Sequence, residues 1–343
     1  MVSVQIYAFF FKSVSLYSKK NIKTGKKISH LCSKRGQNTI FLSKKSLKNV
    51  KKNRKIPPCK IFFVPLQRIK RQTMGKKKIL FINQEISPYV PDNQMSLMGK
   101  ALPQAMQEKG YEIRTFMPKW GNINERRGQL HEVIRLSGMN LIIDDTDHPL
   151  IIKVASIQQT RVQVYFIDND DYFSKRQMEK DEMGEDYPDN GERAIFFARG
   201  VLETVKKLRW VPDIIHCQGW MGAVVPLYVK TAYHDEPSFA NTKVVTSLFS
   251  KGPQKELGTN FKRCVEFRDA TAELLQPYKD QFDITELGKL AIDYSDGIIL
   301  ADQEVNAELL KHTQTQGRPV LGFHDEDFAD AYEEFYQQIC PED

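Results

Sequence analysis

The sequence predicts an α/β protein built on a single doubly wound, mostly parallel, Rossmann-like sheet. From Lys78 onward, short apolar runs alternate with longer segments of helical periodicity, as expected for parallel strands joined by crossover helices. The apolar runs are continuous and do not alternate with polar residues, which favours strands buried on both faces. Residues 132–156 break this alternation, and we expect them to form a β insert, a hairpin on the edge of the sheet.

Each expected element follows from its own stretch of sequence. The apolar runs predict strands at 79–83, 112–117, 162–168, 213–217, 243–248 and 297–301. Helical periodicity predicts helices at 95–109, 190–208, 220–233, 287–294, 303–313 and 325–339. The 190–208 helix has the clearest pattern, because one apolar stripe runs from Ile195 to Leu208, with Asp189 or Asn190 as its N-cap.

Charge divides the chain into two regions. Residues 1–73 contain 19 of the 50 Lys and Arg residues and none of the 43 Asp and Glu residues. Residues 74–343 therefore hold 31 basic and 43 acidic residues, a net charge of −12. We expect residues 1–73 to be a basic extension, either disordered or translated from upstream of a true start at Met74; a transit or anchor segment and a nucleic-acid arm remain alternatives. For residues 74–343 we expect one domain that binds no nucleic acid.

Hydropathy and cysteine content also indicate where in the cell the protein is expected to be. No apolar run reaches the roughly 18 residues that cross a bilayer, so no membrane partner is expected. Cys217, Cys264 and Cys340 are far apart, which favours neither a zinc site nor a disulfide framework. A cytoplasmic location is the expectation.

Several motifs occur in a fixed order along the domain. They are Lys78 to Tyr89 (KILFINQEISPY), Gly110 to Pro118 (GYEIRTFMP), Asp186 to Arg193 (DYPDNGER), Trp210 to Trp220 (WVPDIIHCQGW), Lys243 to Thr246 (KVVT) and Tyr294 to Ile298 (YSDGI). This ordered set resembles the N-terminal catalytic half of bacterial glycogen synthases and plant starch synthases, over residues 78 to about 302. The resemblance implies the N-terminal half of a GT-B fold and glucosyl transfer from ADP-glucose to an α-1,4-glucan, with no cofactor besides that donor substrate.

Three loops depart from the family pattern. Where the family has a Lys-x-Gly-Gly-Leu loop that approaches the donor phosphates, this chain reads Pro91 to Met95 (PDNQM). Gly219 stands where the family has an Asp, and Ser247 to Ser250 replace a His-Asn pair. We interpret the Pro91–Met95 loop as a strand-to-helix turn capped by Asp92 or Asn93. We therefore assign no catalytic residue.

The resemblance also implies which residues would bind substrate: His216, Gln218, Trp220, Glu85, Asp189 and Arg193. Each also has a structural interpretation. His216 and Trp220 would be packed residues, Asp189 or Asn190 a helix cap, Arg193 the partner of a carboxylate, and Glu85 a residue that orders its loop.

No metal site is expected, because the acidic clusters at 144–145 and 168–171 lack the ligand spacing of a calcium loop and are interpreted as solvated turns. Two functions follow. The first is a truncated glycogen/starch synthase homologue with little or no activity alone; the alternative is a non-catalytic glucan-binding, regulatory or scaffold module. An α-glucan and a protein partner are the expected partners.

Overall fold

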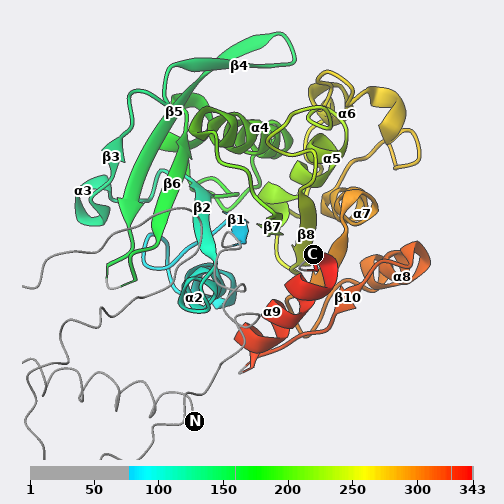
Figure 1. Ribbon diagram of the computed structural model, residues 1–343. Helices are drawn as coiled ribbons and strands as arrows, with labels where there is room; N and C mark the ends of the chain where they lie inside the picture. Colours follow the sequence, from blue (N-terminus) through cyan, green and yellow to red (C-terminus); the bar gives the residue numbers. More distant parts are fainter. Residues whose placement is uncertain (1–76, 159, 326, 342–343) are drawn as a thin grey trace, which may run out of the picture. The chain divides into compact units, whose positions relative to one another are not determined.

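The computed structural model describes residues 77–158, 160–325 and 327–341 (Figure 1). The extension expected at residues 1–73 lies outside the described residues. Within the described residues, ten strands form one mostly parallel sheet in the order β10-β9-β8-β7-β1-β2-β6-β5-β3, with β4 paired to β5. The predicted α/β class and doubly wound sheet are therefore confirmed.

The six predicted strands all occur, each within one residue of its predicted ends. They are β1 (Lys78–Asn83), β2 (Glu112–Pro118), β6 (Gln163–Asp168), β7 (Ile214–Gln218), β8 (Lys243–Leu248) and β9 (Gly297–Leu300). All pair in parallel with their neighbours in this set. A two-residue edge strand, β10 (Val320–Leu321), is too short to give a periodic signal and was not predicted.

The predicted β insert is present at the other edge of the sheet. β4 (Met139–Ile143) and β5 (Thr146–Ser156) form an antiparallel hairpin, and β5 pairs antiparallel with β6. The short β3 (His131–Glu132) pairs with the outer side of β5. The hairpin therefore extends the sheet beyond its parallel strands.

The helices connect and cover the strands. The longer ones are α2 (Gln94–Glu108), α4 (Asn190–Leu208), α7 (Ile284–Tyr294), α8 (Ala307–Gln316) and α9 (Phe328–Ile339). Short segments are α3 (Glu125–Gly128), η4 (Asp170–Ser174), η5 (Trp220–Gly222), α5 (Val225–Lys230), α6 (Phe261–Cys264) and η6 (Ala272–Leu275). Within the described residues, no helix is both long enough and apolar enough to cross a membrane.

One predicted helix is wrong. The segment 220–233 divides into the 3-10 turn η5 and the short helix α5, with Pro226 in the first turn of α5. Proline has no N–H to continue an incoming helix, but it fits the first turn of a new one. α7 also starts three residues earlier than predicted, at Ile284, because Asp283 caps it.

Alternate residues of the central strand face opposite layers of helices. Leu80 and Ile82 of β1 belong to the large core that contains the buried stripes of α4, α5 and α7. Ile79 and Phe81 belong to a second core with residues of α2 and α9. Figure 1 shows α2 and α9 on one side of the sheet and α4, α5 and α7 on the other. The continuous apolar runs of the strands reflect burial on both faces.

Candidate functional site

The carboxyl ends of β1 and β7 mark the point where the chain reverses its direction of travel across the sheet. β2 and β6 lie on one side of β1, and β7, β8 and β9 lie on the other. Ligands of open α/β sheets bind in the crevice outside such a switch point. Of the predicted site residues, Glu85 follows β1, and Gln218 and Trp220 lie at the end of β7.

The loop after β1 is held by hydrogen bonds among its own polar groups. Asn93 Oδ1 accepts from the Ser96 amide at 3.0 Å, and the Asn93 amide donates to Ser96 Oγ at 2.9 Å, which forms a capping box. Asn93 Nδ2 also donates to the buried Glu85 carboxylate, and Ser87 Oγ donates to Asp92 at 2.7 Å. The interpretation of this loop as a capped turn is confirmed, as is the ordering of the loop by Glu85.

His216 is fully buried between two hydroxyl groups. Its Nε2 lies 2.7 Å from Ser247 Oγ and its Nδ1 lies 2.7 Å from the hydroxyl of Tyr336 on α9. Desolvation lowers the pKa of the imidazole to about 3, so the ring is neutral at physiological pH. His216 is thus a packed residue of β7, which agrees with its structural interpretation.

Three amide side chains with unpaired atoms lie at the carboxyl ends of β1 and β7. Gln218 is fully buried, and neither its Oε1 nor its Nε2 has a hydrogen-bond partner among the described residues. Asn83, its neighbour in the sheet register, and Gln84 each have an unpaired buried side-chain oxygen as well. Gly219 has φ +85°, and a Cβ there would lie 2.7 Å from Gln84 Oε1. An aspartate would therefore be strained at position 219.

Trp220 is buried and contacts the carboxylate of Glu179, a residue that was not among the predicted site residues. Its Nε1 donates to Glu179 Oε2 at 3.4 Å. Desolvation raises the pKa of Glu179, and the nearby charge of Glu85 raises it further. Only the tertiary structure brings Glu179 to this site, because it lies in an irregular segment that has no motif of its own.

Asp189 and Arg193 lie at the start of α4 with partners that differ from those predicted. Neither Asp189 nor Asn190 makes a side-chain cap. Asp189 instead accepts two hydrogen bonds from Arg176, at 2.5 and 2.7 Å. Asp189 does occupy the predicted N-cap position, but its carboxylate is held by the Arg176 guanidinium and does not accept from the first amides of the helix, so only the side-chain cap is absent.

Arg193 is fully buried and does not pair with a carboxylate. It donates to the Tyr172 and Gln177 carbonyls and to Asn190 Oδ1, at 2.8 to 2.9 Å. The predicted ion pair is wrong, because backbone and amide oxygens occupy the donors of this guanidinium. Desolvation and the neighbouring charge of Arg176 lower the pKa of Arg193 to about 10. Arg193 therefore fastens the 172–177 segment to α4.

One acidic cluster is only partly solvated. Asp168 is buried, pairs with Lys153 at 2.8 Å and accepts from Ser174 Oγ at 2.7 Å, so its interpretation as a solvated residue is wrong. Asp170 and Asp171 are exposed, as expected. Among the residues that the structure describes, no three His, Cys, Asp or Glu side chains are placed to hold a metal ion.

An open hollow of about 530 Å³ lies beside Trp220 and Glu179. Its lining comes from the 179–180 segment, the loop after β8 and the start of α7: Glu179, Lys180, Ser250, Lys251, Gly252, Pro253, Gln254, Asp283, Ile284 and Thr285. Ile284 also lines a small, mostly apolar hollow that contains Trp220. Within the described residues Lys251 makes no ion pair. The lining of the larger hollow thus contains two lysines, of which Lys180 is paired with Asp186, two carboxylates, Glu179 and Asp283, and neutral polar groups.

Comparison with known proteins gives one consistent family. Residues 78–321 match the family model described as starch synthase catalytic domain. The glycogen synthase of Chlorobium luteolum is 38% identical over 172 residues, and that of Chlorobaculum tepidum is 39% identical over 172 residues. In both cases the match covers 50% of this chain and 35% of the relative, so the chain spans about a third of the length of these curated relatives.

A solved structure shares the fold. The catalytic domain of starch synthase IV from Arabidopsis thaliana, bound to ADP and acarbose, superposes with a TM-score of 0.61 at 17% identity. The superposition covers 73% of this chain and 52% of that one. The same arrangement of strands and helices therefore occurs in both.

Proposed function

Because this chain belongs to the glycogen and starch synthase family, we propose that it is a glucan-binding member that does not by itself transfer glucose from ADP-glucose. The ligand would be an α-1,4-glucan, bound in the hollow beside Trp220 and Glu179. The donor half of the family reaction would be lost. The predicted contact residues Gln218 and His216 are fully buried and are not among the described residues that line this hollow, so neither would contact the glucan directly.

The position and chemistry of this hollow support the proposal that the chain binds a glucan, which is the acceptor in the family reaction. It lies at the carboxyl end of β8, next to the switch point, and its volume is within the range of small-molecule sites. Glu179 and Lys251 offer carboxylate and ammonium groups that bind sugar hydroxyls, and the Ser250 hydroxyl, which donates to Asp302, offers its oxygen as an acceptor. The glucan would therefore contact these solvent-facing residues instead of Gln218, which was the contact expected from the sequence.

The loop after β1 supports the loss of donor chemistry. A departing diphosphate needs cations or free amides, and here Pro91 supplies neither while Asp92 adds a negative charge. The side chain of Asn93 is already used to cap α2 and to bind Glu85. Gly219 supplies no carboxylate, and both nitrogens of His216 are occupied. Each of these features removes an electrostatic contact that transfer would use.

A binding experiment tests the acceptor half. Maltoheptaose titrated into the full chain should perturb the tryptophan fluorescence, with millimolar affinity. Lys251→Ala should weaken this binding several-fold, while Lys311→Ala, an exposed lysine on α8 outside the hollow, should leave it unchanged. Equal effects of the two variants, or no response of the unmodified chain to maltoheptaose, would remove the glucan site.

An activity assay tests the donor half. We expect no incorporation of labelled glucose from ADP-glucose into glycogen above a control without protein. Incorporation that disappears in Glu179→Gln would show that the chain is a transferase with Glu179 in its active site, contrary to the proposal.

A further inference from the structure

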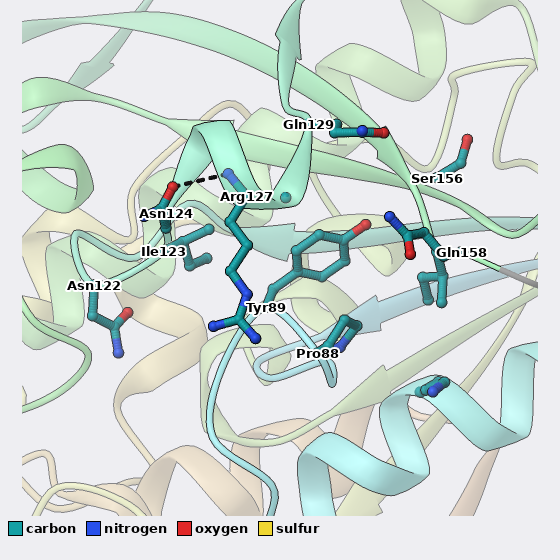
Figure 2. Close-up of a pocket in the computed structure, with 12 residues that line it drawn as sticks. Pro88, Tyr89, Asn122, Ile123, Asn124, Arg127, Gln129, Ser156 and Gln158 are labelled. Atoms are coloured by element: carbon teal, nitrogen blue, oxygen red, sulfur yellow. Dashed lines mark hydrogen bonds between the residues drawn. The ribbon is translucent and has the colours of Figure 1, made fainter.

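We propose that a second hollow, about 440 Å³ in volume, is a binding site for a small phosphorylated sugar. It lies among the loop after β1, α2, the β2–α3 segment and the end of β5 (Figure 2). Its lining residues are Pro88, Tyr89, Lys100, Asn122, Ile123, Asn124, Arg127, Gly128, Gln129, Ser156, Ile157 and Gln158. None of them lines the hollow assigned to the glucan.

The charged side chains in the lining of this hollow are positive. Among the described residues no Asp or Glu occurs in this lining, although residues 74–343 carry a net charge of −12. The two charged residues are Lys100 and Arg127, and neither makes an ion pair within residues 77–158, 160–325 and 327–341. Two uncompensated cations that face one concave space attract an anion with two negative charges. A phosphate ester carries such a charge near neutral pH.

Arg127 supplies the geometry that phosphate prefers. Its side chain extends from α3 toward the Pro88–Tyr89 side of the hollow, with Asn122 nearby (Figure 2). A guanidinium binds two phosphate oxygens through parallel N–H donors, and it stays charged at every physiological pH. Lys100 on α2 would then act as a second point charge on the same anion.

Tyr89 and its neighbours give one side of the hollow an apolar surface. The ring of Tyr89 stands edge-on to buried Phe166, with centroids 4.9 Å apart, so its orientation is held. A Cβ on Gly128 would lie 3.3 Å from this ring and 2.6 Å from Leu130 Cδ1, so the glycine allows α3 to approach closely. Buried Ile123 and Ile157 complete an apolar floor. This surface suits the C–H face of a sugar ring.

Neutral polar groups form the remaining rim. Asn122, Gln129, Gln158 and Ser156 are exposed and offer amide and hydroxyl groups to ligand hydroxyls. Asn124 Oδ1 accepts from the Arg127 amide at 2.9 Å, which leaves its Nδ2 as a donor. A neutral glucan would leave both cations unpaired, and free phosphate would leave the floor and the amides unused. A phosphorylated monosaccharide uses all three sets of groups.

Calorimetric titration of the full chain with glucose 1-phosphate, glucose and inorganic phosphate tests this site. Glucose 1-phosphate should bind at least several-fold more tightly than either component, and more weakly at 200 mM than at 20 mM NaCl. Arg127→Gln should weaken binding about tenfold, the usual effect of losing a charged hydrogen-bonding group. Lys100→Gln should act in the same direction.

The matched control is Arg126→Gln, because Arg126 is exposed on the same short helix but does not line the hollow. It should leave the affinity within twofold. Equal losses in the two arginine variants would overturn the proposal, as would inorganic phosphate binding as tightly as glucose 1-phosphate. Loss of binding in Lys251→Ala would place the ligand in the other hollow and also overturn it. Maltoheptaose binding is measured separately, so failure of the glucan site and failure of this one are distinguishable.

Discussion

Burial makes His216 a group that destabilises the fold in acid. Its pKa is about 3 in the folded chain because burial disfavours the charged ring, well below the ordinary value of about 6.5. Between these two pH values the unfolded chain binds a proton that the folded chain does not, so this histidine favours unfolding as the pH decreases. Its contribution is constant above about pH 6.5 and grows more unfavourable below it, down to about pH 3.

Replacing His216 should therefore change the slope of stability against pH. We expect His216→Gln to be less stable than the unmodified chain at pH 7.5, with a difference that shrinks as the pH falls below 6.5. The change should be up to about 1.4 kcal/mol per pH unit. Urea denaturation of both proteins from pH 7.5 to 4 measures it. A constant difference over this range would mean that the imidazole has the same pKa in the folded and the unfolded chain.

Arg193 is a second residue whose role comes from burial. Arg193→Met keeps the aliphatic stem but leaves the Tyr172 and Gln177 carbonyls and Asn190 Oδ1 without their donor. We expect a loss of roughly 3 kcal/mol in the free energy of unfolding. Arg126→Met, at an exposed position, should change it by less than about 0.5 kcal/mol. Similar urea midpoints for the two variants would contradict this assignment.

At the scale of the element, the start of α2 depends on one side chain with two roles. Asn93 caps the helix and also binds Glu85. Asn93→Ala should lower the free energy of unfolding by about 1 to 2 kcal/mol, the usual range for a lost cap. Asn93→Ser, which retains a capping oxygen, should recover most of this loss. Urea denaturation decides between the two roles, because a serine variant as unstable as the alanine variant would place the stability in the Glu85 contact.

Element positions were predictable to different degrees. β8 has the predicted ends, because the five apolar and small residues that follow Lys243 specify a buried strand through their own composition. The 220–233 helix failed at Pro226, where local backbone chemistry overrides apolar periodicity. Asp189 has the predicted N-cap position of α4, but its side chain does not cap the helix because Arg176, thirteen residues earlier, binds it in the fold. Such a partner cannot be identified from the residues adjacent to Asp189 in the sequence.

At the scale of the whole molecule, every described strand and helix begins at or after Lys78. We predict that a chain starting at Met74 folds to the same structure. It should show one cooperative thermal transition by circular dichroism and a dispersed NMR spectrum. An insoluble or molten product that recovers when residues 1–73 are restored would contradict the independence of this domain.

The charge difference between the two regions gives a second prediction at this scale. A chain of residues 74–343, with a net charge of −12, should not bind a 20-base-pair DNA duplex at 50 mM NaCl. Fluorescence anisotropy of labelled DNA measures this, with the full chain and its 19 added basic residues as the comparison. Binding by the shorter chain that weakens as salt increases would overturn the prediction.

The main strands of the sheet, the β insert and the family could be predicted from the sequence, because apolar periodicity and ordered motifs are properties of neighbouring residues. The roles of the candidate site residues depend on the tertiary structure. His216 is held by Tyr336, which lies 120 residues further along the chain. Glu179 reaches Trp220, and Lys100 and Arg127 face one hollow, through the packing of separate elements. Partners, burial and pKa values depend on contacts between distant segments, and those contacts exist only after the strands have paired and the helices have packed on them.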